Sequence, residues 1–377
     1  MKQCRRLITL FLFTTAAFCA PVVAAEPASQ EVILGVITPL TGDGATYGRS
    51  TTQGVDLAIE AWNATHALKI KTSVEDDRMS PEEGVAAYQR QVAAASRPSA
   101  ILGPFGSSVV LAVARVANEA KVSIITASAT ADAIAEAGPN VFRIVPTNRT
   151  QGRDDARFAL DVLHAKTAAV LFQTNDYGQS LKDSFVAEFT VGGGRVVLEE
   201  GARNATTDFR TQVSKIKAAN PDVIFFPIQS QEGTVFLRQL RDRGVKTPCI
   251  SGDGAMTTEL LKGAGKAAEG AYFSSLALGY GVTDEQIHTF EAAFRVKYGK
   301  DPDVYAAYYY EAAQIVASAI EAAGRDPEKV TEYLASMSGL RAFTGITGVT
   351  AFDARGEVDK RFYVYQAKAG KFVRVKQ

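Results

Sequence analysis

Two segments rich in glycine and hydroxyl side chains follow apolar runs that are typical of strands. The first is Gly103–Ser108, and the second carries Ser128 and Thr130. Glycine lets a backbone approach a ligand closely, and Ser107 and Ser108 open an apolar-striped helical pattern whose first N–H groups lack partners within the helix. Such a helix start suits a carboxylate, although either serine could equally be an ordinary N-cap. Two adjacent donor-rich loops favour an anion site.

Residues suited to catalysis or metal binding show no comparable grouping. His66, His164 and His288 are scattered along the chain, which has no HExxH or CxxC spacing. No G-x-S-x-G motif is present for a serine nucleophile. The turn Gly42–Gly44, with Gly48 after it, could hold phosphate but has the wrong spacing for a dinucleotide. The sequence therefore predicts no enzyme, metal site or cofactor.

The segments that must position the polar loops alternate between strand and helix patterns. One such series runs from Val32 to Thr126, and a second of similar length runs from Thr167 to Ser251. Repeated strand–helix–strand units form parallel sheets flanked by helices. The sequence therefore predicts an α/β protein with two similar lobes.

The two predicted lobes are connected more than once. Val141–Pro146 is expected to be an extended crossing segment, and the Gly-bracketed stretch Ala277–Gly281 a return crossing. The long helical pattern Tyr305–Ala323 is then expected to belong to the first lobe again. Ligands of open α/β sheets bind beyond the carboxyl ends of the strands, which here would face the cleft between the lobes.

The N-terminus has the features of a secretory signal peptide. Three basic residues precede the apolar run Leu7–Phe18, and small residues lead up to a cleavage site after Ala25. The run is too short for a membrane span and is stopped by Pro21. We therefore expect an exported, periplasmic protein. Cleavage leaves Cys249 as the one cysteine, which we expect to be a small buried residue rather than a nucleophile.

Composition fits a soluble protein with a large core. The 377 residues are 46% hydrophobic and 22% charged, with 41 Lys and Arg against 41 Asp and Glu. Without the signal peptide, which holds three basic and no acidic residues, the net formal charge is about −3. This balance gives no basic excess for nucleic acid or an anionic membrane surface.

Several segments, taken in order, carry a family resemblance. They are Val32–Gly42, Ala45–Gly48, Gly54–Glu60, Gly103–Ser108, Ser128–Thr130, Phe142–Arg143 with Gln151–Gly152, Asn175–Gly178 and Ser251–Gly254. Each is loose alone, but their order and spacing resemble the periplasmic leucine/isoleucine/valine-binding proteins of ABC importers. The resemblance covers essentially the whole mature chain.

The resemblance implies the type I periplasmic binding protein fold, in which two Rossmann-like lobes with parallel sheets are joined by a three-crossing hinge. After a signal peptide at 1–25, residues 26–145 and 278–360 would form the N-terminal lobe. Residues 146–277 and 361–377 would form the C-terminal lobe.

The resemblance also implies roles for individual residues. The family holds the ligand carboxylate with a serine that matches Ser107 and with groups that match Ser128 and Thr130. Its ammonium site uses an acidic residue that matches Asp253, with a tyrosine that matches Tyr177 nearby. From the residues alone, Asp253 could be only a turn residue and Tyr177 only a helix cap.

The chain departs from leucine-binding members of the family around the predicted pocket. Gln229 stands where those proteins have a further tyrosine, and Phe105, beside Gly106, stands where a smaller aliphatic residue is usual. Tyr47 and Tyr305 add aromatic surface. Such a pocket suits an aromatic or polar ligand rather than leucine.

Other aromatic residues are assigned to packing. Trp62 shares its helical face with Val55, Ala58 and Ile59, so we expect it in the core. Of Tyr305, Tyr308, Tyr309 and Tyr310, at most two can face one site, because they lie so close together on one helix.

These observations predict a non-catalytic, monomeric receptor that delivers a small amino acid to an inner-membrane ABC permease. Three alternatives stay open. The protein could bind an aromatic or other small carboxylate or an amide, or it could be a sensory module of the same fold. It could also be an exported enzyme with a catalytic carboxylate such as Asp253 or Asp176.

Overall fold

The structure, a computed structural model of the chain, describes residues 31–276 and 284–375. Its strands form a five-stranded sheet, a seven-stranded sheet and a two-stranded ribbon. The predicted signal peptide and the predicted return crossing Ala277–Gly281 lie outside the described residues. No helix in the described ranges is long and apolar enough to cross a membrane.

The five-stranded sheet is parallel throughout. It contains β1 (Glu31–Thr38), β2 (Lys69–Asp76), β3 (Ala100–Leu102), β4 (Ile124–Thr126) and β5 (Val141–Arg143), in the order β2-β1-β3-β4-β5. The parallel sheet predicted for the first series is confirmed. Val141–Arg143, expected as part of a crossing segment, is instead an edge strand, because its backbone pairs in register with β4.

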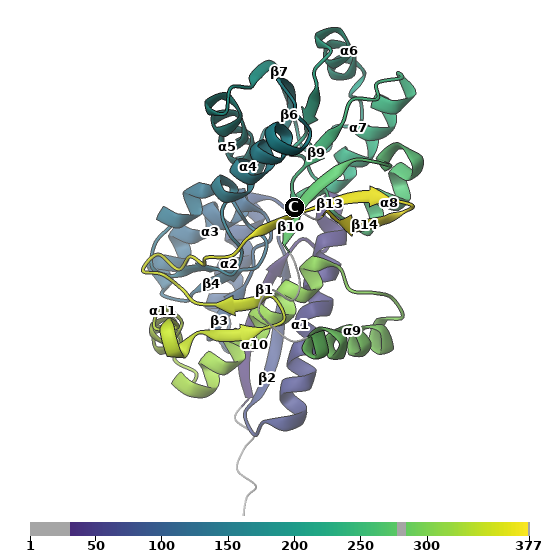
Figure 1. Ribbon diagram of the computed structural model, residues 1–377. Helices are drawn as coiled ribbons and strands as arrows, with labels where there is room; N and C mark the ends of the chain where they lie inside the picture. Colours follow the sequence, from purple (N-terminus) through teal and green to yellow (C-terminus); the bar gives the residue numbers. More distant parts are fainter. Residues whose placement is uncertain (1–30, 277–283, 376–377) are drawn as a thin grey trace, which may run out of the picture. The chain divides into compact units, whose positions relative to one another are not determined.

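Helices cover both faces of this sheet. They are α1 (Ala45–Thr65), α2 (Pro81–Ala93), α3 (Ser107–Ala120), α10 (Val304–Ala323) and α11 (Pro327–Ala335), whereas α9 (Asp284–Tyr298) packs against α1 and α10. Alternate side chains of β1 point to opposite faces, so Leu34 and Val36 join the core with α1 and α10, whereas Ile37 joins the core with α2 and α3. Figure 1 shows α10 lying beside α1, although they are far apart in sequence. This return of α10 is as predicted.

The seven-stranded sheet is parallel except at one edge. It contains β6 (Thr167–Gln173), β7 (Arg195–Ala202), β8 (Val223–Phe225), β9 (Cys249–Ser251), β10 (Tyr272–Leu276), β13 (Phe362–Lys368) and β14 (Lys371–Arg374). Their order is β14-β13-β10-β9-β8-β6-β7. β13 pairs antiparallel with β10 and β14 antiparallel with β13, so the predicted parallel sheet ends in an antiparallel edge that the sequence analysis did not anticipate. Ala369 and Gly370 have φ of 51° and 73°, the positive values that a two-residue hairpin turn requires.

The helices that accompany the second sheet are α4 (Asn148–Arg157), α5 (Asp176–Val191), α6 (Arg210–Ala219), α7 (Ser230–Asp242) and α8 (Thr258–Ala264). A π-helical turn, Phe158–Val162, continues α4. The second sheet also separates two cores, one with α6 and α7 and the other with α4 and α5. The predicted second α/β series is confirmed.

The chain passes between the two sheets after β5, after β10, and between the ribbon β11 (Phe343–Gly345) and β12 (Gly348–Thr350) and strand β13. A buried ion pair ties the first passage to the third. Arg143 Nε donates to Glu357 Oε2 at 2.8 Å, and Arg143 Nη1 donates to the Ala131 carbonyl at 2.9 Å. The passages are therefore held to each other by side chains 214 residues apart.

Candidate ligand-binding site

A small cavity, of about 20 Å³, lies beyond the carboxyl ends of strands from both sheets. Its walls come from segments that follow β3, β4, β6, β8 and β9, with one residue from α10. They are Phe105, Gly106, Ser107, Ser128, Tyr177, Gln229, Asp253, Gly254 and Tyr305. The structure thus brings eight of the ten predicted ligand residues to one cavity.

The start of α3 forms part of the cavity wall. Gly106 is the N-cap residue, and no side chain caps this helix. Ser107 Oγ accepts from the Ala131 amide at 3.2 Å, while Ser108 Oγ accepts from the Asp176 amide at 3.2 Å. The reading of these serines as ordinary N-caps is therefore wrong. The first-turn N–H groups of α3 keep their capacity to bind an anion.

Ser128 connects the two donor-rich loops. Its hydroxyl donates to the Phe105 carbonyl at 2.8 Å and shares a 3.0 Å hydrogen bond with the Tyr309 hydroxyl. Ser128 follows the short buried strand β4, which lies next to β3 in the sheet. The predicted adjacency of these loops is therefore observed.

Asp253 contributes the carboxylate of the cavity. Its Oδ1 accepts from Tyr177 Oη at 3.2 Å and its Oδ2 from Tyr305 Oη at 3.4 Å. Tyr177 Oη also accepts from the Gly254 amide at 3.1 Å. The cap of α5 is Asn175, whose side chain accepts from the Gly178 amide, so Tyr177 is not merely a cap. Asp253 caps no helix and its side chain points into the protein, so it is more than a turn residue.

The electrostatic environment of Asp253 is unfavourable to its charge. Burial raises its pKa from 3.8 to about 6, although hydrogen bonds from Gln151 and Tyr177 act in the opposite direction. None of the nine lining residues is basic. A cationic group that entered the cavity would therefore find a buried carboxylate without a cationic partner.

Two predicted site residues, Tyr47 and Thr130, do not line the cavity. The ring of Tyr47 stacks on Phe105 with centroids 4.6 Å apart, and its hydroxyl donates to the Gly254 carbonyl at 2.5 Å. That hydroxyl also accepts from the Ser230 amide at 2.9 Å. Tyr47 therefore stands behind the wall and bridges elements of both sheets. Thr130 is fully buried and is not part of the cavity wall.

Two residues at the site were not predicted as ligand residues. Gly254 lies on the wall next to Asp253, and the side chain of the buried Gln151 lowers the pKa of Asp253. Gln151 lies in one of the segments that carry the family resemblance, which was the available signal. Its role could not be predicted from the sequence, because only the fold brings α4 near Asp253, which lies about 100 residues further along the chain.

The aromatic assignments are confirmed. Of the four clustered tyrosines, Tyr305 lines the cavity and Tyr309 bonds Ser128 behind it. Tyr310 packs against Phe290 with centroids 4.8 Å apart. Trp62 lies against the core and stacks on His66 at 3.7 Å.

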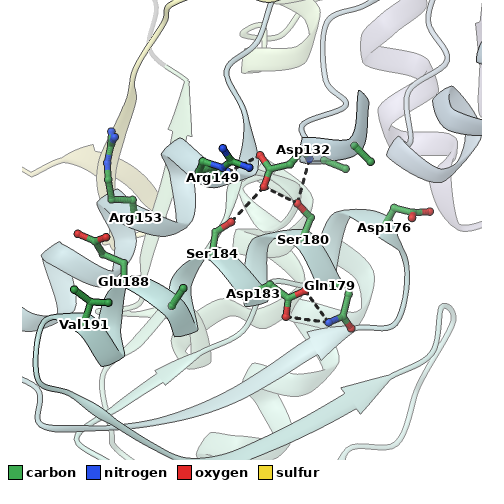
Figure 2. A pocket seen from close by; sticks show the side chains of 13 residues that line it. Asp132, Arg149, Arg153, Asp176, Gln179, Ser180, Asp183, Ser184, Glu188 and Val191 are labelled. Carbon is green, nitrogen blue, oxygen red and sulfur yellow. Dashed lines mark hydrogen bonds between the residues drawn. The ribbon is translucent and has the colours of Figure 1, made fainter. Parts of the chain in front are cut away.

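A wider surface hollow lies beside the cavity, between the 3-10 helix η2 (Asp132–Glu136) and helices α4 and α5. Figure 2 shows Asp132 reaching the hydroxyls of Ser180 and Ser184 on α5. Asp132 Oδ1 also accepts from the Arg149 amide at 2.9 Å. Figure 2 shows that Asp183 bonds only Gln179 among the residues drawn, within its own helix. Asp132 therefore joins elements that accompany the two sheets.

The thiol of Cys249, a further candidate nucleophile, lies in a buried and hydrogen-bonded environment. Cys249 is fully buried, and its thiol donates to the Thr247 carbonyl at 3.3 Å. Burial raises the pKa of this thiol, which keeps it in its unreactive form. Across the described ranges, no group of three or more His, Cys, Asp or Glu side chains is arranged to hold a metal ion.

Comparison with known proteins gives consistent matches over most of the chain. The family described as "Periplasmic binding protein" matches residues 31–371. An amino acid binding protein from Pseudomonas aeruginosa is 31% identical over 345 residues, which cover 89% of this chain and 90% of the relative.

Two solved structures are similar in fold. The leucine binding protein LivK from Thermotoga maritima has a TM-score of 0.86 and 29% identity, with 92% of this chain and 98% of that chain covered. LivJ from Streptococcus pneumoniae, in complex with isoleucine, has a TM-score of 0.85 and 27% identity, with coverages of 92% and 100%. These similarities confirm the predicted type I periplasmic binding protein fold. With a family match that spans both sheets, this chain belongs to the periplasmic binding protein family.

Proposed function

We propose that the protein is a solute receptor of an ABC importer and binds a small α-amino acid. One observation carries the proposal: the uncapped start of α3, with Ser107, lines the same cavity as the buried Asp253. An amino acid zwitterion needs N–H and hydroxyl donors for its carboxylate and an anion for its ammonium. The relatives named for amino acid, leucine and isoleucine binding support this ligand class.

In this proposal, different residues of the cavity wall bind the carboxylate, the ammonium and the side chain of the amino acid. Ser107, Ser128 and the first amides of α3 hold the ligand carboxylate. Asp253 holds the ammonium, with Tyr177 beside it, while the ligand side chain lies against Phe105, Gln229 and Tyr305. Tyr47 and Thr130 act indirectly, through the position of Phe105 and of the loop after β4.

Binding is coupled to closure of two lobes in this proposal. Residues 26–145 with 278–360 are the N-terminal lobe, and residues 146–277 with 361–377 are the C-terminal lobe. The carboxylate site lies on the first lobe and Asp253 on the second, so the ligand favours the closed form by its greater affinity for it. The closed form is what the inner-membrane permease recognises.

The wider biological setting is part of the same proposal. The receptor is exported by a signal peptide cleaved after Ala25, acts in the periplasm as a monomer, and catalyses no reaction. It has no nucleic acid partner and feeds a permease rather than a sensory protein.

Aromatic and other small carboxylates without an amine are the second ligand class, favoured by the rings of Phe105 and Tyr305 on the cavity wall. Such an anion leaves Asp253 without a cationic partner, and two buried like charges oppose each other. The amino acid is therefore the first proposal.

A thermal-shift screen of the ligand-free protein, followed by calorimetry, tests the two classes. The panel contains the common α-amino acids, their deaminated acids, small amides and aromatic carboxylates. Ligands that bind the native state raise the melting temperature by mass action. We expect hits among α-amino acids and weaker or no response to the matching deaminated acids. Hits confined to acids without an amine would overturn the proposed role of Asp253.

Affinity is expected to depend on pH through Asp253. Below its pKa of about 6 the carboxyl group is protonated, so its attraction for the ligand ammonium is lost as pH falls. Well below that pH, the Kd should rise by roughly tenfold per unit. Calorimetry between pH 5 and pH 8 measures the profile. In Asp253→Asn the binding should be weak and nearly flat over the same range, and a matching slope in this variant would exclude Asp253 as its source.

Asp132 is expected to stabilise the closed form without touching the ligand. Asp132→Ala removes the acceptor for Ser180, Ser184 and the Arg149 amide, a loss of about 1–2 kcal/mol or a roughly 5- to 30-fold higher Kd. Calorimetry measures the affinity, and small-angle scattering measures the open fraction. Asp183→Ala is the matched control, because Asp183 lines the same hollow. Equal effects of the two variants would contradict this role.

A further inference from the structure

A chain of buried polar side chains extends from Asp253 away from the cavity. Its members are Gln151 and Asp155 on α4 and Ser274 on β10, and none is more than 2% exposed. Gln151 and Asp155 are four residues apart, so they lie on the same face of the helix. Of the three, none lines the cavity. We call them, with Asp253, the buried polar chain.

The hydrogen bonds in the buried polar chain have one consistent direction. Ser274 Oγ donates to Asp155 Oδ2 at 2.9 Å. Because its proton is used in this way, Ser274 Oγ acts as the acceptor for Gln151 Nε2, which lies 2.9 Å away. Gln151 Nε2 also contacts the Ser274 carbonyl at 3.2 Å. The amide group of Gln151 therefore presents its nitrogen and not its oxygen to Ser274.

The same nitrogen serves Asp253. The Gln151 side chain lowers the pKa of Asp253, and one of its two amide protons can serve both Ser274 oxygens, which leaves the other for the Asp253 carboxylate. Gly252 makes room for this contact, since a Cβ there would lie 3.1 Å from Gln151 Nε2 and 2.6 Å from Tyr177 Oη. A reversed amide would instead turn its oxygen toward the carboxylate and repel it.

We propose that Asp155 is a positioning residue for the ligand site: through the Ser274 hydroxyl it fixes the Gln151 amide, which orients Asp253 for an ammonium group. The proposal rests on the proposed binding of an amino acid and adds a residue that sets the preference for an amine. Asp155 touches neither the cavity nor Asp253 itself.

Asp155 acts as an acceptor in this arrangement, through its Oδ2. Burial raises its pKa well above the ordinary value, and the nearby negative charges of Asp154 and Asp253 act in the same direction. Its Oδ1 has no hydrogen-bond partner. Asparagine offers the same acceptor geometry without charge, so Asp155→Asn should preserve the function and Asp155→Ala should not.

The first test uses the ligand-free protein. The titration of Asp253 is followed by carboxyl-carbon NMR in wild type, Asp155→Ala, Asp155→Asn and Ser274→Ala. We expect Asp155→Ala and Ser274→Ala to raise the pKa of Asp253 by about one unit, the worth of one hydrogen bond to a charged acceptor. Asp155→Asn should leave it unchanged. Asp154→Ala is the matched control, since that carboxylate bonds Arg153 instead.

The second test measures amine preference with two aromatic probes, L-phenylalanine and its deaminated counterpart 3-phenylpropanoate, which match the rings of Phe105 and Tyr305 on the cavity wall. Calorimetry at pH 7 should show that Asp155→Ala weakens L-phenylalanine about tenfold and leaves 3-phenylpropanoate nearly unchanged. A packing defect would weaken both probes. Asp155→Asn should restore the wild-type ratio.

The outcomes separate the two proposals. If wild-type protein binds no α-amino acid, the proposed function fails, yet the Asp253 titration still decides the role of Asp155. An unchanged Asp253 pKa in both Asp155→Ala and Ser274→Ala overturns the positioning role, as does a failure of Asp155→Asn to rescue. If Asp155→Ala does not fold, Ser274→Ala carries the test, because it breaks the same link with a smaller change.

Discussion

Asp253→Ala should weaken binding of an α-amino acid by about 2–4 kcal/mol, which is a factor of roughly 30 to 1000 in Kd. The carboxylate is 2% exposed, and no other lining residue carries a charge. Without it, the ligand ammonium would be buried with only the neutral hydroxyls of Tyr177 and Tyr305 as partners. Loss of one partner of a buried charge pair costs this much because the other charge stays desolvated.

Calorimetry at pH 7.5, above the Asp253 pKa of about 6, is the measurement. Asp176→Ala is the control, because Asp176 precedes Tyr177 in sequence but is exposed and lines the surface hollow instead of the cavity. Its Kd should change less than threefold, the scale of an exposed charge. The deaminated analogue should bind Asp253→Ala at least as well as wild type, since a repulsive buried anion is gone. Unchanged amino acid affinity in Asp253→Ala would remove Asp253 from the ammonium site.

Much of the cavity could be predicted because strand ends are visible in sequence. Phe105 to Ser107 and Ser128 follow apolar runs, and the carboxyl ends of parallel strands meet at one edge of a sheet. Asp253 and Tyr177 came from the family resemblance and not from any local pattern. Both routes locate a segment of the backbone, and the structure brings residues from both sets to the same cavity.

The two misplaced residues show where this reasoning stops. Thr130 lies two residues beyond Ser128, yet it is fully buried and absent from the cavity wall, and the sequence does not show which residues of a loop face the cavity. Tyr47 was expected as aromatic pocket surface, but Phe105 comes between it and the cavity. Which of two stacked rings faces a ligand depends on packing between elements far apart in the chain.

The antiparallel edge of the second sheet was missed for a different reason. Strands β13 and β14 follow a helical region and a ribbon, so the strand–helix rhythm that predicts parallel sheets does not cover them. The local feature that could have indicated this hairpin is the two-residue turn of Ala369 and Gly370 between the two strands. The buried ion pair between Arg143 and Glu357 could not be predicted either, because the two residues are 214 positions apart in the sequence.

A second buried ion pair joins Glu311 and Lys360. We expect its disruption to have the largest effect on the stability of the protein. Glu311 on α10 is fully buried and accepts from the Thr347 amide at 2.6 Å and from Lys360 Nζ at 3.3 Å. Lys360 belongs to the passage between β12 and β13, and its side chain is 6% exposed. Burial already lowers the pKa of Lys360, which the charge of Glu311 opposes. The pair therefore holds this passage against α10.

Glu311→Ala should lower the free energy of unfolding by about 3–5 kcal/mol, because it leaves the Lys360 ammonium buried and unpaired. Urea unfolding monitored by circular dichroism measures the change. Glu60→Ala, which breaks a largely exposed pair with Lys297, should cost less than about 1 kcal/mol. Adding Lys360→Met to Glu311→Ala should recover much of the loss, because removing both charges leaves no unpaired ion. A double variant no more stable than Glu311→Ala would show that the lost Thr347 contacts, and not the stranded ammonium, dominate.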